Sequence, residues 1–286
     1  MFRHTLVFFG EHSEDWITTL LSSQLLSLLK KHGIRSIKHV TDAGDLRWSP
    51  TLHSVIPLLD KHATRLHQEI SPGSWLAKRI IAPSPPAIKA FAHKQLFSAY
   101  IQQHSLEHLT PRHFHSIQDF QESGIQHAIS KPDTGSSGVG CRILESGREA
   151  DGSDDTRGKM VIQEYIPGDQ EWVTHAIANQ GRVTKQVTYL YHLPDPVCIK
   201  TFGVKCPAER VPDAPVKLDV LEQFLMPLNY TGVCCFNYKI SIPDQQLKVL
   251  EINPRMGGSL MHGPHINDLV SIIGGLLELG STAQKP

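Results

Sequence analysis

A glycine-rich stretch, SKPDTGSSGVGCRIL at 130–144, carries residues that could bind a phosphate group. Its glycines allow backbone N–H groups to approach phosphate oxygens closely, and Ser136 and Ser137 add hydroxyl donors. Lys131, on the predicted strand that leads into the loop, would direct its ammonium group toward the same anion. The combination predicts a phosphate-binding hairpin, and a flexible hairpin without a ligand is the alternative.

Two other interpretations of this stretch disagree with its sequence. Asp133-Thr134-Gly135 is the tripeptide of an aspartic protease, but that chemistry needs two carboxylates that share a proton, and the chain has no second Asp-Thr-Gly or Asp-Ser-Gly. The loop glycines have the spacing of a P-loop, but Cys141 and Arg142 stand where that motif requires Lys and Ser or Thr. We therefore interpret Asp133 as a turn residue.

A second group of polar residues lies near the end of the chain. Glu251 and Asn253 are two apart on a predicted strand, so both face one side of it. An odd-numbered hairpin loop would place Asn237, on the preceding strand, opposite one of them, whereas an even-numbered loop would turn it to the other face. One carboxylate and two amide oxygens suit Mg²⁺, which takes further ligands from water and substrate phosphates. Arg255 could stabilise charge on a transferring phosphoryl group. An ordinary polar strand surface is the alternative for Asn237.

The composition excludes several functional classes. The 286 residues contain 28 Lys plus Arg and 28 Asp plus Glu, so no global basic field favours nucleic acid. No apolar run approaches the roughly 18 residues of a membrane helix, and the apolar run at the start is too short for a signal-peptide core. Five cysteines without a C-x-x-C motif indicate reduced thiols. We therefore expect a cytoplasmic protein that binds neither nucleic acid nor membrane.

The hydrophobic patterns predict the elements that must position these residues. Strands are expected at 5–10, 34–40, 54–60 and 79–84, with a helix over 15–33 and a second helix at 61–70 that Asp60 would cap. They form a small open, mostly parallel sheet. One or two helices follow at 84–106, a short strand lies within 108–117, and strands flank the glycine-rich loop.

The sequence pattern of the second half of the chain predicts mainly antiparallel strands. A polar loop at 145–159 precedes a strand at 160–168, and 171–190 is a hairpin that turns at Asn179-Gln180-Gly181. An irregular loop at 193–212 and a helix within 216–229 lead to the strands 232–242 and 247–253, and a helix at 267–280 closes the chain. The fold class is α/β, with α+β lobes.

Four motifs, in this order, resemble the ATP-grasp superfamily: HKQLFSAYIQQHSLEHLTP, SKPDTGSSGVG, VIQEYIPGDQEWVTHAI and LKVLEINPRMGGS. The preceding residues resemble the N-terminal lobe of its carboxylate–amine ligase branch, which includes carbamoyl phosphate synthetase halves and the pyrrolysine pathway ligase. The resemblance implies an ATP-grasp fold with three parts. These are an N-terminal open α/β lobe at 1–84, linker helices with a small mobile lid lobe at 85–166, and a mainly antiparallel α+β lobe with the metal site at 167–286.

The resemblance also implies a role for individual residues. Those expected to bind ATP are Lys94, Lys131, Ser136, Ser137, Gly138, Glu164, Tyr165, Ile166, Glu171 and Lys200. Those expected to hold Mg²⁺, with Mn²⁺ as an alternative, are Asn237, Glu251 and Asn253. Arg255 and Lys131 would be catalytic, and Arg255, Gly257, Gly258 and Ser259 would contact the substrate. Asn237 departs from the family pattern, because many members carry Asp or Glu there.

The reaction that the resemblance implies is the ATP-dependent joining of a small carboxylate, such as an amino acid, to an amine. An acyl phosphate would form first, with release of ADP and then of phosphate. The alternatives are phosphoryl transfer or carboxylation without amide formation, and a nucleotide-binding protein without turnover. The expected partners are the two small-molecule substrates, and a homodimer is left open.

Overall fold

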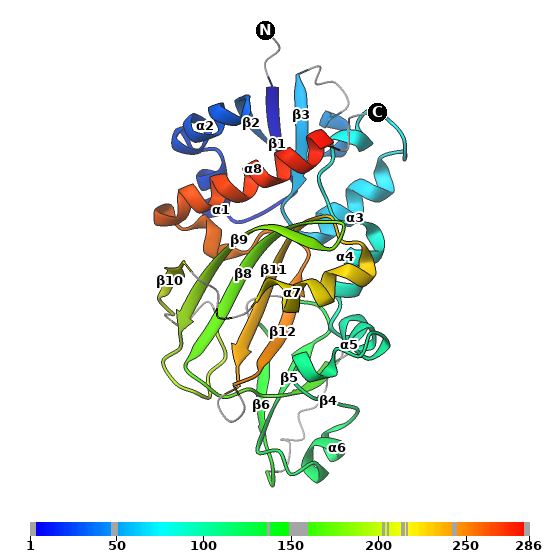
Figure 1. The fold of residues 1–286 in the computed structure, drawn as a ribbon, viewed down its shortest axis with the longest axis vertical. Coiled ribbons are helices and arrows are strands. Elements are labelled where there is room, and N and C mark those ends of the chain that lie inside the picture. Colours follow the sequence, from blue (N-terminus) through cyan, green and yellow to red (C-terminus); the bar gives the residue numbers. More distant parts are fainter. Residues whose placement is uncertain are drawn as a thin grey trace.

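The structure is a computed structural model that describes residues 4–46, 51–135, 138–148, 160–201, 204, 206–212, 215, 217–241 and 245–282. These residues form a three-stranded, a four-stranded and a five-stranded sheet. Figure 1 shows the three-stranded and four-stranded sheets at opposite ends of the molecule, with the five-stranded sheet between them. Seven short 3-10 helices also occur in this part of the chain: η1 Lys30–His32, η2 Ala43–Leu46, η3 Ala77–Arg79, η4 Glu107–Leu109, η5 Met226–Leu228, η6 Gly258–Met261 and η7 Gly263–His265.

The first sheet is parallel, as the sequence predicts, with the order β2-β1-β3. Its strands are β1 (His4–Phe9), β2 (Ile34–Val40) and β3 (Leu52–Pro57), and its helices are α1 (Glu14–Leu20), α2 (Ser23–Leu29) and α3 (Asp60–Glu69). The strand expected at 79–84 is reduced to a single bridge between Ile80 and Val55. Prolines at 83, 85 and 86 lack the N–H that a longer ladder would need.

Two helix predictions in this lobe are wrong in detail. The helix expected over 15–33 is divided, because Ser22 adopts an extended conformation and its hydroxyl accepts the Leu25 N–H to begin α2. Asp60 does not cap α3. Leu59 occupies the cap position, and the Asp60 carboxylate instead accepts a hydrogen bond from Arg255.

The four-stranded sheet is antiparallel, with the order β4-β7-β5-β6. Its strands are β4 (His113–Phe114), β5 (His127–Pro132), β6 (Arg142–Glu145) and β7 (Met160–Glu164). The helix α6 (Ile117–Glu122) packs Phe120 against Phe114 and Ala128. The glycine-rich loop joins β5 to β6, as predicted. Most of the polar loop predicted at 145–159 lies outside the described residues.

The five-stranded sheet is also antiparallel, with the order β10-β9-β8-β11-β12. Its strands are β8 (Gln170–Asn179), β9 (Arg182–His192), β10 (Ala208–Val211), β11 (Gly232–Ile240) and β12 (Leu247–Asn253). The predicted hairpin is confirmed, because Gln180 and Gly181 both have positive φ, as a type I′ turn requires. The loop predicted at 193–212 was expected to be irregular throughout, but it ends in β10, which pairs with β9.

Two sets of helices cover the two faces of this sheet. The helices α4 (Pro85–Ala92), α5 (Lys94–Gln103) and α7 (Leu218–Leu225) pack on the face that carries Ala176 and Phe236. The helix α8 (Ile266–Thr282) packs on the face that carries Ile177 and Val233. None of the described helices combines the length and the apolar character needed to span a bilayer.

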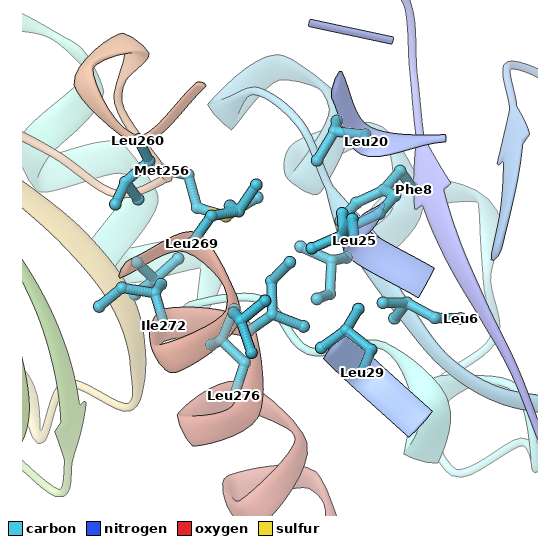
Figure 2. Packing of buried hydrophobic residues seen from close by; sticks show 14 of the residues in the cluster. Leu6, Phe8, Leu20, Leu25, Leu29, Met256, Leu260, Leu269, Ile272 and Leu276 are labelled. Atoms are coloured by element: carbon cyan, nitrogen blue, oxygen red, sulfur yellow. The ribbon is translucent and has the colours of Figure 1, made fainter. Parts of the chain in front are cut away.

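The C-terminal helix joins the first sheet to the five-stranded sheet through one core. Leu269, Ile272 and Leu276 of α8 are fully buried, and the same cluster contains Leu6 and Phe8 of β1. Figure 2 shows Leu6, Phe8, Leu25 and Leu29 of the first lobe on one side of α8 and Ile272 of the helix on the other side. The last helix therefore fixes the N-terminal lobe against the sheet that carries β12.

Candidate active site

One cavity of about 430 Å³ gathers almost all of the residues predicted from the sequence. Its lining comes from the N-terminal lobe, the start of α5, the four-stranded sheet, the loop after β9, and β8, β9, β11 and β12 of the five-stranded sheet. The predicted residues that line it are Lys94, Lys131, Gly138, Glu164, Tyr165, Ile166, Glu171, Lys200, Asn237, Glu251, Asn253, Arg255, Gly257, Gly258 and Ser259. Ser136 and Ser137, also predicted, lie outside the described residues.

Asn237 and Glu251 are directly paired across β11 and β12, on the face that the sequence predicts. The reason differs from the expected one. Ile240 pairs with Leu247, so six residues separate these two strand positions, and that even number alone would turn Asn237 away. A β-bulge between Asn237 and Tyr238 shifts the register by one and restores the pairing.

The Glu251 carboxylate is the centre of the polar group on these strands. Its Oε1 accepts hydrogen bonds from Asn237 Nδ2 at 3.1 Å and from Asn253 Nδ2 at 3.0 Å. Burial alone would raise the pKa of Glu251, but Lys94, Lys131, the hydrogen bond from Asn253 and Arg255 together outweigh burial, and the pKa is lowered. Glu251 is therefore ionised and faces two lysines that come from the other side of the cavity.

The donor set of this group fits a hard cation in part. Glu251 Oε2 and Asn237 Oδ1 have no hydrogen-bond partner within the described residues, whereas Asn253 Oδ1 accepts from Arg255 Nη2 at 3.1 Å. Two oxygens are thus free to ligate, and the third becomes free if the Asn253 amide turns. Across the described chain, no cluster of three His, Cys, Asp or Glu side chains forms a metal site of that kind.

Arg255 links the polar group of Asn237, Glu251 and Asn253 to the N-terminal lobe. Its Nη2 donates to Asn253, and its Nε donates to Asp60 Oδ1 at 3.3 Å, at the start of α3. The Arg255 side chain is 14% exposed. A planar guanidinium held from two sides is well suited to bind an anionic oxygen with its remaining donors.

The glycine-rich loop lies against the loop that carries Lys200. Gly138 has a φ of +69°, and a Cβ atom placed there would lie 2.7 Å from the Lys200 carbonyl oxygen and 2.8 Å from Ile199 Cγ2. Only glycine permits this conformation together with this close approach. The described part of the loop therefore covers one side of the cavity.

Asp133 is a structural residue, as predicted, although it does more than form a turn. Its Oδ1 accepts the Gln95 N–H at 2.8 Å, and its carbonyl oxygen accepts the Lys94 N–H at 3.1 Å. These are first-turn N–H groups of α5, which lack partners within the helix. Asp133 thus ties the end of β5 to the helix that carries Lys94.

Glu171 and Lys200 form a close ion pair on the cavity wall. Burial lowers the pKa of Lys200, but the Glu171 carboxylate outweighs it, and the pKa is raised. Lys200 also lies over the Tyr191 ring, 4.1 Å from its centre. These two residues, both predicted to bind ATP, therefore bind each other in this structure.

The segment 164–166 connects the four-stranded sheet to the five-stranded sheet. The Glu164 and Tyr165 N–H groups donate to the carbonyl oxygens of Arg112 and His127. The Tyr165 hydroxyl is bonded to the backbone of Cys198. Ile166 lines the cavity, and its N–H has no hydrogen-bond partner among the described residues.

The Ser259 side chain is hydrogen-bonded to a buried histidine, His175. Gly257 N–H donates to His175 Nδ1 at 3.4 Å, so the ring carries its proton on Nε2, which donates to Ser259 Oγ at 2.7 Å. Burial lowers the pKa of His175 to about 3, with further lowering by Arg255 and His265. The neutral His175 side chain therefore fixes the Gly257–Ser259 turn through two hydrogen bonds.

The sequence indicated that the N-terminal lobe would line the substrate pocket, but it did not identify the residues that do so. His12 and Trp16 line it, and their rings stack with centres 3.7 Å apart. Leu59 also lines it, next to Asp60. The position of His12 and Trp16 in the sequence could have indicated this contribution. Residues directly after the first strand of a parallel sheet lie at its carboxyl edge, where ligands bind.

Comparisons with known proteins agree with this architecture. No model of a protein family matches the sequence, and no curated protein sequence matches it. The structure is similar to D-alanyl-alanine synthetase A from Vibrio cholerae, with a TM-score of 0.68 at 13% identity, covering 99% of each chain. It is similar to D-alanine–D-alanine ligase from Bacillus anthracis, with a TM-score of 0.67 at 15% identity, covering 98% of this chain and 97% of the other.

A third similar structure is a biotin carboxylase complex with β,γ-ATP from Campylobacter jejuni. The TM-score is 0.66 at 12% identity, and the match covers 98% of this chain and 72% of the other. These proteins share the ATP-grasp fold, and the matches extend over nearly the whole chain. The chain therefore has the ATP-grasp fold, as the sequence predicts.

Proposed function

We propose that this ATP-grasp chain is an ATP-dependent ligase that joins a carboxylate to an amine through an acyl phosphate. The observation that carries the proposal is the pairing of charges across one cavity. Lys94 and Lys131 face Glu251 closely enough to contribute to its lowered pKa, and Arg255 lies two residues beyond Asn253. Cations on one wall and a cation-binding carboxylate on the other suit a triphosphate with its metal ion.

The nucleotide would enter with its base at the segment 164–166. The partnerless Ile166 N–H is a donor for a ring nitrogen, and the Glu164 carbonyl oxygen is an acceptor for an amino group. Glu171 would accept the ribose hydroxyls, which requires that Lys200 release it and turn toward the phosphates. Lys94, Lys131 and the N–H groups around Gly138 would contact the phosphates.

The residues that would hold Mg²⁺ are Glu251 and Asn237, with Asn253 once its amide turns. The ion, when bound, would neutralise charge on the phosphate oxygens. The side chains and the substrates carry out the two steps of the reaction.

In the first step, a carboxylate oxygen attacks the γ-phosphorus, the bond to the bridging oxygen breaks, and ADP leaves. Lys131 and Arg255 stabilise the charge on the transferring group. In the second step, the amine attacks the acyl carbon, loses a proton to solvent, and expels phosphate. No protein nucleophile is required. Closure by the glycine-rich loop would exclude water, which otherwise hydrolyses the acyl phosphate.

The carboxylate substrate would lie between Arg255 and the N-terminal lobe. His12, Trp16 and Leu59 line the cavity there, and so does the Gly257–Ser259 turn. Both substrates would therefore be small molecules.

Carboxylation without amide formation is the second candidate function. It is favoured by the similarity to a biotin carboxylase over 98% of this chain. Phosphoryl transfer without ligation and ATP binding without turnover are further alternatives, and the amide of Asn237 in place of a carboxylate keeps the last one open.

Product analysis separates these functions. The protein is incubated with ATP, Mg²⁺ and pooled carboxylates and amines, with bicarbonate in a parallel reaction. Ligation predicts ADP, phosphate and a conjugate whose mass is that of the two substrates less one water. AMP with pyrophosphate would refute an acyl phosphate, and turnover only with bicarbonate would favour carboxylation. Bound ATP without turnover on any pool would favour a binding protein.

A further inference from the structure

Lys131 is held by a partly buried row of hydrogen-bonded side chains that begins on the far strand of its sheet, with Gln163 fully buried at its centre. Lys131 Nζ donates to Gln163 Oε1 at 2.8 Å, and Gln163 Nε2 lies 3.1 Å from His113 Nε2. The residues come from β5, β7 and β4, which are adjacent in the sheet. His113 pairs directly with Gln163, and Ile129, two residues before Lys131, also pairs with Gln163. All three side chains therefore share one face.

The donors of Lys131 determine the orientation of the Gln163 amide and the tautomer of His113. Burial lowers the pKa of Lys131, and the Glu251 carboxylate opposes that shift. In its ammonium form Lys131 donates only, so the Gln163 amide must present its oxygen to it. The amide nitrogen then faces His113, and it also donates. His113 Nε2 must therefore carry a lone pair, so the ring is neutral with its proton on Nδ1.

Burial makes this orientation the favoured one. Gln163 is 2% exposed, so water cannot replace a lost partner. Burial also lowers the pKa of His113 to about 4, with a further contribution from Lys131, so the neutral ring is the form present near neutral pH. A turned Gln163 amide would direct its NH₂ group at the ammonium.

We propose that Gln163 and His113 are positioning residues that direct the remaining Lys131 donors into the cavity and thereby set the affinity for the phosphates of the nucleotide. The inference rests on the proposed function, because it takes Lys131 to be a phosphate ligand. Neither residue contacts the nucleotide in this account. His113 does not line the cavity, and neither does Gln163.

The test compares a ligand that has phosphates with one that has none. Dissociation constants for a nonhydrolysable ATP analogue with Mg²⁺ and for adenosine are measured by calorimetry. His113→Leu removes the acceptor, whereas His113→Gln keeps an acceptor near the Nε2 position. We expect His113→Leu and Gln163→Leu to weaken binding of the analogue about 10-fold. Adenosine affinity should stay within about 2-fold, and His113→Gln should restore the analogue.

The control is His115→Leu, because His115 is exposed two residues further along. Unchanged affinity for the analogue in both leucine variants would overturn the inference. Equal losses for the analogue and for adenosine would also overturn it, because they indicate a general distortion. If the unaltered protein bound neither ligand, the proposed function itself would fail, and that result differs from a failure of the positioning role alone.

Discussion

Replacing His175 with glutamine should make the protein less sensitive to acid. The folded protein holds the His175 pKa at about 3, whereas an unfolded histidine titrates near about 6.5. The stability that this difference provides is complete above about pH 6.5 and is lost as the pH falls toward 3, because only the unfolded state takes up the proton.

The magnitude follows from the two pKa values. Between pH 8 and pH 5, the unaltered protein should lose about 2 kcal/mol of unfolding free energy through His175 alone. His175→Gln should lose about 2 kcal/mol less over the same range. At pH 8 it should itself be about 1–3 kcal/mol less stable, because Gly257 N–H loses its acceptor.

The assay is urea unfolding at a series of pH values between 8 and 5. The matched control is His108→Gln, because His108 is exposed. Relative to the unaltered protein, His175→Gln should gain about 2 kcal/mol of unfolding free energy between pH 8 and pH 5. A difference that stays constant from pH 8 to pH 5 would refute the claim that the buried ring remains neutral.

Two further predictions concern the covering loop and the shared core. Gly138→Ala should weaken binding of an ATP analogue about 10-fold, because the new methyl group meets the Lys200 carbonyl oxygen. Gly147→Ala is the control, since Gly147 also has positive φ but has no neighbour within 4 Å, and an equal loss there would contradict the steric argument. Leu276→Ala should cost about 2–5 kcal/mol in a single calorimetric transition. Leu21→Ala, at a 44% exposed position, should cost under about 0.5 kcal/mol, and a separate early transition for the first lobe would contradict the shared core.

Patterns of hydrophobic residues predicted most of the strands, because alternation along a strand and apolar spacing in a helix are local properties. The hairpin turn at Gln180 and Gly181 was equally local. The division of the first helix at Ser22 was less visible, because a serine in a helical pattern indicates a cap only once its hydroxyl is seen to accept an N–H group.

The residues of the candidate site were predictable by type, but their partners were not. Asn237 and Glu251 pair because of a β-bulge, which hydrophobic pattern alone does not reveal. The contact of Asp60 with Arg255 joins residues far apart in sequence, and so does that of His175 with Ser259. Such contacts depend on how the lobes pack, so they follow from the tertiary structure alone.

The role of Glu251 offers a further check. Glu251→Gln removes the carboxylate that faces the two lysines but keeps its shape, so turnover should fall at least about 100-fold while the fold remains intact. Steady-state ADP release and circular dichroism measure the two effects, and retained turnover would remove the metal site from the account.

The proposed ligation begins when a carboxylate oxygen attacks the γ-phosphate of ATP. The most direct measurement uses a carboxylate substrate labelled with ¹⁸O on both oxygens, followed by mass analysis of the phosphate released. Ligation predicts that each phosphate carries one ¹⁸O atom, because the bond between the acyl carbon and the transferred oxygen breaks in the second step. Unlabelled phosphate, or label found in AMP, would contradict it.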